Sequence, residues 1–260
     1  MNAAHWLVRL YPGAIRERWG ADLELEVQAA GWRTWPNLAV SVAGMWLHPA
    51  IWPADSRAQR RQRAATMAIS VAAACSFLTL AATELDTPLS AVAGTWPMTV
   101  CGVLMLLGTV LVAPRPRLTP GAAITVLRQA VRRLAAPAIV GAGVVACVHS
   151  GVDVAGVPAP VRLALLACWW SALAAGAVQC CRIVAGLGAG VAVPPRPGRL
   201  RLGIWILAGA GAGTAAVIFG VFVTGARHDP TSGAMGAALF VLVWAFVATV
   251  RDLRRLPQTG

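Results

Sequence analysis

Residues 57–82 read RAQRRQRAATMAISVAAACSFLTLAA and decide the fold. Four arginines occupy the first seven positions, and nineteen uncharged, mostly apolar residues follow, from Ala64 to Ala82. At 1.5 Å of rise per residue, such a run matches the roughly 30 Å hydrocarbon core of a bilayer. Because cytoplasmic loops carry the excess of Lys and Arg, this stretch predicts a transmembrane helix whose first end lies in the cytoplasm.

The overall composition also points to a membrane protein. Of the 260 residues, 58% are hydrophobic and 12% are charged, which is more apolar than a soluble domain requires. The net charge of +12 comes from 22 basic residues, all of them Arg, and most of these flank apolar runs. That distribution is typical of membrane topology rather than of a face that follows phosphates, so we expect no nucleic-acid partner.

The alternation of arginine cluster and apolar run recurs to the C-terminus. We expect six spans, at residues 64–82, 91–113, 134–148 (extending to about 154), 161–185, 203–226 and 233–250. An even number of spans places both termini in the cytoplasm together with the arginine clusters at 57–63, 115–133, 182–201 and 251–255. The predicted fold is therefore an all-α, polytopic helical bundle in the inner (cytoplasmic) membrane.

The first 53 residues differ from the rest, because they hold four of the ten acidic residues. Short helices are expected at 3–10 and at 14–29, the second with an apolar stripe formed by Ile15, Trp19, Leu23 and Val27. The apolar segment 36–51 is marginal for a span and suits a helix in the interface, although its insertion would move the N-terminus outside. We expect three parts, namely a cytoplasmic or interfacial prefix (1–53), a membrane domain (64–250) and a cytoplasmic tail (251–260).

The prefix carries a family resemblance. The strings LVRLYPGAIRERWGADLELEV and NLAVSVAGMWLHP resemble the helical prefix, of the permease-prefix or HAAS-like type, that begins many actinobacterial membrane proteins. The match is carried by Leu10-Tyr11-Pro12, Arg16, Arg18, Trp19, Gly20 and His48-Pro49, and it covers roughly the first fifty residues. It implies a cytoplasmic adaptor on a membrane protein, and it implies no reaction.

Motifs for cofactors and metals are weak. The six cysteines show no CxxC spacing and are read as small apolar residues, so we expect no metal site. The string GAGTAA at 211–216 lies inside a predicted span rather than in a βαβ unit, so we expect no dinucleotide or other cofactor. The chain has no lysine, so it contains no GxxxxGK[ST] sequence and is not its own P-loop ATPase.

Ionisable residues gather at the predicted outer ends of the spans. They are Glu84, Asp86, His149, Asp153 and Asp229, and His149 and Asp153 would share a side if the helix continued between them. One interpretation makes them ligands of a cation or a lipid headgroup, or an acid and base for catalysis. The other makes them solvated loop residues, and the sequence leaves open whether the protein is an enzyme.

A basic amphipathic helix is expected at 124–134. Arg128, Arg132 and Arg133 lie on one side of it, and Ile124, Leu127 and Val131 form its apolar side. Such a helix either contacts anionic lipid or docks a soluble partner, as coupling helices of ABC exporters do. Two pairs of small residues, Gly186 with Gly190 and Gly209 with Gly213, either mark close contacts between spans or are glycines that a Gly- and Ala-rich membrane chain merely tolerates.

Three function classes remain at this point. The first is a membrane subunit of an export or immunity system that works with a separate cytoplasmic ATPase, and this is our prediction. The second is a membrane anchor or signal transducer for a cytoplasmic regulator. The third is a small intramembrane enzyme that acts on an apolar substrate through the outer carboxylates. A homo-oligomer is compatible with all three.

Overall fold

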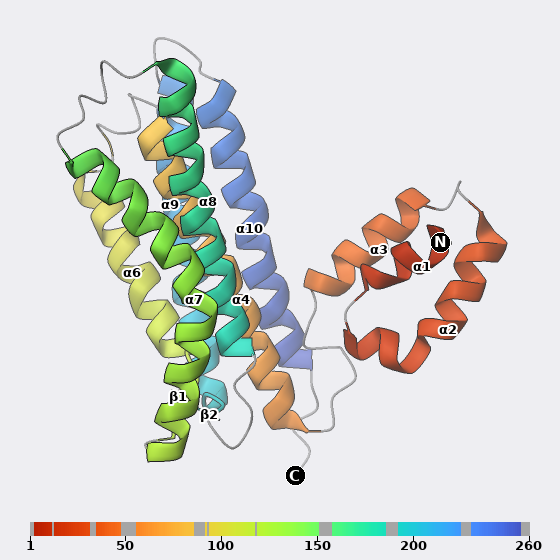
Figure 1. Ribbon diagram of the computed structural model, residues 1–260. Helices are drawn as coiled ribbons and strands as arrows, with labels where there is room; N and C mark the ends of the chain where they lie inside the picture. Colours follow the sequence, from red (N-terminus) through yellow and green to blue (C-terminus); the bar gives the residue numbers. More distant parts are fainter. Residues whose placement is uncertain are drawn as a thin grey trace. The chain divides into compact units, whose positions relative to one another are not determined.

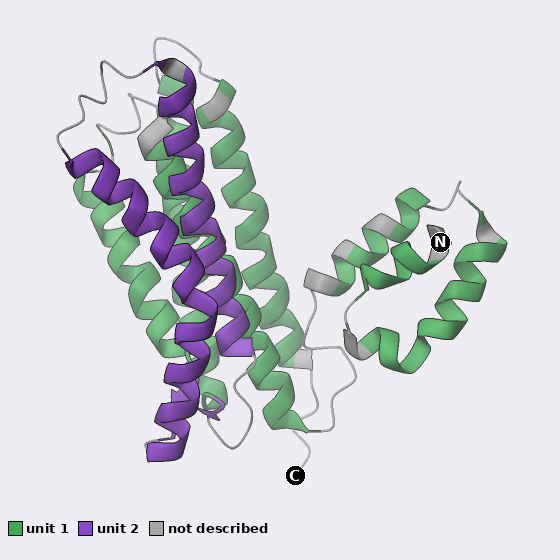
Figure 2. Cartoon of the chain, viewed as in Figure 1, with its two compact units in different colours: residues 1–113, 195–260 green, residues 114–194 purple. Residues whose placement is uncertain are grey.

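The chain is helical almost throughout (Figure 1). The computed structural model describes residues 3–11, 13–31, 35–47, 56–85, 92, 94–117, 119–150, 158–185, 192–224 and 230–255. The chain divides into two compact units, shown in Figure 2. Unit 1 comprises Met1–Ala113 and Pro195–Gly260, and unit 2 comprises Pro114–Pro194.

Five helices are long and apolar enough to cross a membrane. They are α4 (Arg57–Leu85), α7 (Pro120–His149), α8 (Ala159–Ala185), α9 (Pro197–Thr224) and α10 (Pro230–Arg255). A sixth apolar helix, α6 (Trp96–Val112), is shorter, with 17 residues. These helices confirm the all-α architecture and indicate a multi-pass membrane protein.

Helix α6 begins later than the sequence predicts. A span from residue 91 was expected, but Thr95 is the N-cap and Pro97 lies in the first turn. Proline lacks the N–H that a helix interior uses, so the first turn is the position in a helix where it costs least. The resulting helix is about 25 Å long, shorter than the roughly 30 Å hydrocarbon core.

Other helices are longer than predicted, so several residues expected in loops are helical. Helix α9 begins at Pro197 instead of 203, and α10 continues to Arg255 instead of ending at 250. The prediction of a separate amphipathic helix at 124–134 was also wrong, because these residues belong to α7, which runs unbroken for 30 residues. Pro137 lies inside it and removes one backbone hydrogen bond without ending the helix.

In unit 1, helices α4, α6, α9 and α10 pack into a bundle with α9 in contact with each of the other three. The buried side chains of α9 include Leu200, Ile204, Leu207 and Ile218, which lie on one side of that helix. The core is otherwise built mostly from alanine and other small residues of α4, together with Phe246 and Leu239 of α10. Small residues allow helices to approach closely where lipid supplies no hydrophobic driving force.

Two glycines bring the backbones of α6 and α9 together. A methyl group at Gly108 would lie 2.7 Å from Cγ of Leu207, and one at Gly203 would lie 2.7 Å from Cγ2 of Val112. Each would also lie 3.1 Å from the other glycine's carbonyl oxygen. Leu207 and Val112 therefore fill the spaces that the glycines leave, and the crossing requires glycine at both positions.

The predicted glycine contacts were therefore only partly right. A methyl group at Gly209 would meet no atom within 4 Å, whereas one at Gly213 would lie 2.9 Å from Sγ of Cys101. The pair therefore does not act together, because only Gly213 faces α6. Gly186 and Gly190 lie outside the described residues.

The prefix forms three helices, α1 (Ala3–Arg9), α2 (Gly13–Ala30) and α3 (Trp35–Leu47). Val8 and Val27 are buried together, with Leu7, Leu23 and Leu38 packed against them. The expected stripe on α2 holds for Ile15, Leu23 and Val27, but Trp19 is exposed. With 13 residues, α3 spans about 20 Å and is too short to cross the hydrocarbon core as a helix.

Unit 2 is a helical hairpin whose open end is tied by two short strands. Helices α7 and α8 pack on each other, with Gly141 facing Ala172 and Trp169. Strand β1 (Arg115–Pro116) precedes α7, and β2 (Ala192–Val193) follows α8. They pair antiparallel, Arg115 with Val193 and Pro116 with Ala192, a connection that the sequence analysis did not predict. The proposed division into residues 1–53, 64–250 and 251–260 stays a prediction.

We expect Gly108→Ala and Gly203→Ala to destabilise the protein. The added methyl group cannot be accommodated without separating α6 from α9, which costs about 1–3 kcal/mol of the free energy of unfolding. The thermal midpoint of the detergent-solubilised protein, followed by size-exclusion chromatography, measures the effect. Gly209→Ala is the matched control on α9, because the same change meets open space and adds helix propensity. Equal midpoints for all three variants would contradict the close crossing.

Candidate functional site

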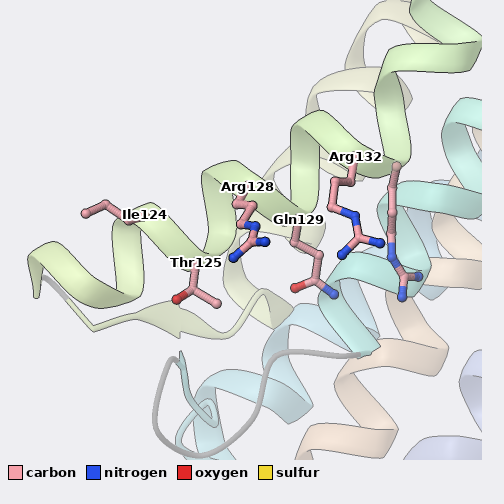
Figure 3. Close-up of a pocket in the computed structure, with 6 residues that line it drawn as sticks. Ile124, Thr125, Arg128, Gln129 and Arg132 are labelled. Atoms are coloured by element: carbon pink, nitrogen blue, oxygen red, sulfur yellow. The ribbon is translucent and has the colours of Figure 1, made fainter.

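The first half of α7 carries a hollow lined by arginines. Thr119 caps the helix, since its side chain accepts a hydrogen bond from the backbone N–H of Ala122, and Pro120 occupies the first turn. The hollow has a volume of about 580 Å³ and is lined by Ile124, Thr125, Arg128, Gln129, Arg132 and Arg133. Arg128, Gln129 and Arg132 project from one side of the helix (Figure 3). We call these six residues the arginine hollow.

An exposed apolar strip lies beside the arginine hollow on the same helix. Ile124, Leu127 and Val131 are 65%, 64% and 60% exposed. At 100° per residue, these three positions fall within one sector of the helix, next to the sector that holds Arg128 and Arg132. The predicted amphipathic pattern is thus present, although on the start of a long helix and not on a separate one.

The arginines of the hollow have no internal counter-charge in the described structure. No hydrogen bond or ion pair is recorded for the side chains of Arg128, Arg132 and Arg133 among the described residues. Unit 2 contains seven arginines and one acidic residue, Asp153, which lies outside the described residues. A concentration of positive charge of this kind attracts anions from outside the unit.

Two arginines of unit 1 are used differently, because they satisfy the ends of neighbouring helices. The Arg199 guanidinium donates to the carbonyl oxygen of Val110 at 2.6 Å, and that of Arg201 donates to Leu253 at 3.3 Å. Arg254 lies over the ring of Trp205, 5.8 Å from its centre. The carbonyls in the last turn of a helix lack partners within the helix, so Arg199 caps α6 and Arg201 caps α10.

These contacts also fix the directions of the helices in unit 1. Arg199 and Arg201 lie in the first turns of α9, while their acceptors lie in the last turns of α6 and α10. The start of α9 and the ends of α6 and α10 therefore lie at one end of the bundle. This alternation agrees with the up-and-down order that the arginine clusters predict.

Of the five residues predicted at the outer face, four have side chains outside the described part of the structure. Asp86, Asp153 and Asp229 lie outside the described residues. Glu84 lies in the last turn of α4, and its side chain is not among those described. His149 is exposed, and its Nδ1–H donates to the carbonyl oxygen of Val145 at 2.9 Å. A shared site for these five residues stays a prediction.

His149 and Asp153 were expected to share a side only if the helix continued between them. Helix α7 ends at His149 with Ser150 as its C-cap, and Asp153 lies outside the described residues. The six cysteines are all free, and no three His, Cys, Asp or Glu side chains within the described ranges gather as metal ligands would.

The prefix contains a second, smaller hollow and several exposed aromatic side chains. The hollow, of about 290 Å³, is bordered by a hydrogen bond in which Nδ1 of His5 lies 2.7 Å from Oε1 of Glu24. Trp6 and Trp19 are exposed, and each lies under a guanidinium group, of Arg9 and Arg18 respectively, at 5.4 Å. Stacking of this kind holds a large apolar surface in place while leaving it accessible.

Compared with protein-family models, curated proteins and solved structures, the chain has no significant match. The resemblance of the prefix to the actinobacterial type therefore stays a prediction. Within the prefix, the motif residue Tyr11 is buried, whereas Leu10 and Trp19 are exposed.

Sequence reasoning missed the capping role of Arg199 and Arg201, which it placed in a loop. The signal was present in the spacing of Pro197 and Arg199, since proline favours the first turn of a helix. It also missed Gly108, a glycine in an apolar run with no small partner three or four residues away.

We expect Arg199→Gln to lower the free energy of unfolding by about 1 kcal/mol or more, because the Val110 carbonyl loses a charged donor. The thermal midpoint of the purified protein measures this loss. Arg196→Gln removes the same charge three residues earlier, from an exposed side chain, and should leave the midpoint unchanged. If both variants lose the same stability, charge and not the cap accounts for the effect.

Proposed function

We propose that this protein is the membrane subunit of an export or immunity system that a separate cytoplasmic ATPase energises. It would cross the inner membrane six times, with α6 as the shortest span and with both termini in the cytoplasm. A 17-residue helix can be accommodated by local thinning of the bilayer at modest cost.

The observation that carries the proposal is the construction of the prefix. Its three helices enclose a small core of their own around Val8 and Val27, so they do not need the spans to bury their apolar side chains. They nevertheless expose Trp6, Trp19 and Leu25. Exposed aromatic side chains on a polar helical module are typical of surfaces that bind another protein.

The chemistry of the chain supports a separate source of energy. A P-loop requires a lysine, and the chain has none. A protein that moves a substrate against a gradient by ATP hydrolysis would therefore need a partner that binds ATP. The prefix is the part of the chain best suited to hold such a partner in the cytoplasm.

A second candidate function is favoured by the core of unit 1. Within the described helices, Thr79, Thr109, Thr214 and Thr249 each donate to the carbonyl oxygen four residues earlier in their own helix. Their hydroxyl groups are thus satisfied locally and do not line a polar path. A membrane anchor or signal transducer for a cytoplasmic regulator needs no such path, whereas an exporter would have to build one with another subunit.

Affinity purification of the full-length protein from its native membranes in a mild detergent tests the proposal. We expect a protein with a GxxxxGK[ST] sequence to co-purify and the complex to hydrolyse ATP. Trp6→Ala combined with Trp19→Ala should reduce recovery of that partner at least tenfold, since losing a central aromatic anchor costs about 2 kcal/mol or more.

Trp244→Ala is the matched control, because Trp244 is at least as exposed as Trp6 and Trp19 but lies on α10. It should leave recovery unchanged, and all variants should elute from size exclusion as the parent does. Specific recovery of a regulator without ATPase activity would contradict the export role and favour the anchor. Loss of the partner with Trp244→Ala alone would contradict docking on the prefix.

A further inference from the structure

We propose that the arginine hollow of α7 binds the phosphate group of an anionic phospholipid, with the lipid tail along the exposed apolar side chains that follow the hollow on α7, among them Ile139, Val140 and Val145. The hollow would act as a built headgroup site and not merely as a region of diffuse positive charge. This inference is independent of the proposed ATPase partner, because it concerns only α7 and the bilayer.

The length of α7 places the hollow at headgroup depth. Its 30 residues extend about 45 Å, and the hydrocarbon core is about 30 Å thick. Roughly a third of the helix must therefore project beyond the hydrocarbon. The uncharged part, from Leu134 to Val148, extends about 22 Å and lies within the hydrocarbon. Arg132 and Arg133 therefore lie at the edge of the hydrocarbon and Arg128 beyond it, where long arginine side chains reach the headgroups.

The charges of the hollow call for an anion from outside the chain. No acidic residue occurs between Asp86 and Asp153, so none is available on α7 or on the segment before it. The side chains of Arg128, Arg132 and Arg133 make no recorded contact with a carboxylate in the described structure. Guanidinium groups present fixed pairs of donors that match the geometry of a phosphate.

The neighbours of the arginines select a lipid over a soluble phosphate. On the hydrocarbon side of the arginines, Ile139, Val140 and Val145 are 71%, 45% and 43% exposed. An acyl chain can lie along them while the headgroup remains in the hollow, which a soluble phosphate cannot do. Gln129 adds a neutral donor and acceptor to the lining, suited to the polar groups beside the phosphate.

Native mass spectrometry of the full-length, detergent-solubilised protein tests the inference. The probe is dioleoyl phosphatidylglycerol, with dioleoyl phosphatidylcholine as the neutral lipid and inorganic phosphate as the soluble anion. We expect one phosphatidylglycerol to be retained in preference to phosphatidylcholine. The triple variant Arg128→Gln, Arg132→Gln and Arg133→Gln should weaken that binding on the order of a hundredfold, because each arginine contributes about a factor of five.

A second triple variant separates position from net charge. Arg117→Gln, Arg162→Gln and Arg182→Gln removes the same three charges from unit 2 but none from the hollow. It should retain phosphatidylglycerol as the parent does. Both triple variants should elute from size exclusion as the parent does. This control separates loss of lipid binding from a folding defect.

Three outcomes would overturn the inference. Equal loss of lipid in the two triple variants would show general attraction without a site. Competition by inorganic phosphate at equal concentration would show that the hollow serves a soluble anion. Loss of a co-purified protein partner in the first triple variant, with phosphatidylglycerol binding intact, would assign the hollow to protein docking. None of these results bears on the prefix, so failure here is distinguishable from failure of the proposed function.

Discussion

An arginine side chain cannot remain in hydrocarbon without a partner, and this constraint organises the whole chain. In unit 1 the guanidinium groups at the start of α9 meet the last carbonyls of α6 and α10, so each arginine also satisfies backbone groups that the helix leaves open. In unit 2 the arginines of α7 find no such acceptor in the described structure and are left to an external anion. The same residue type thus fixes helix directions in one unit and offers a binding surface in the other.

The sequence predicts what depends on the length and charge of single segments. Five apolar helices and the three prefix helices lie close to where periodicity places them, because a run such as Ala64–Ala82 has few alternative structures. Prediction from the sequence fails where a residue's role depends on a contact between segments. Gly108 and Gly203 are 95 positions apart, and only the crossing of α6 and α9 shows why neither tolerates a side chain. The arginine hollow was predicted as an amphipathic pattern, but not its continuity with a span, because the arginines up to Arg133 were taken as a cytoplasmic segment that ends where the apolar run begins.

The two units divide the requirements of a membrane protein between them. Unit 1 combines a tightly packed bundle, in which threonine hydroxyls are satisfied within their own helices, with a prefix that folds around a core of its own. Such a bundle is suited to rigid support, and the exposed tryptophans of the prefix are suited to recognition. Unit 2 exposes most of the apolar side chains of α7 and α8, which is the surface that lipid or another subunit would cover. Support, recognition and contact with the bilayer are therefore assigned to different parts of the chain.

The most direct test of the account is the side of the membrane on which the arginine-rich helix ends lie. In a variant without its six native cysteines, single cysteines would replace Ser56 and Arg117 at the arginine-rich ends, and His149 and Thr224 at the opposite ends of α7 and α9. Whole cells would be treated with a membrane-impermeant maleimide before and after permeabilisation. The account predicts that positions 149 and 224 react in intact cells, while 56 and 117 react only after permeabilisation. Reaction of 56 or 117 in intact cells, with 149 and 224 protected, would contradict it.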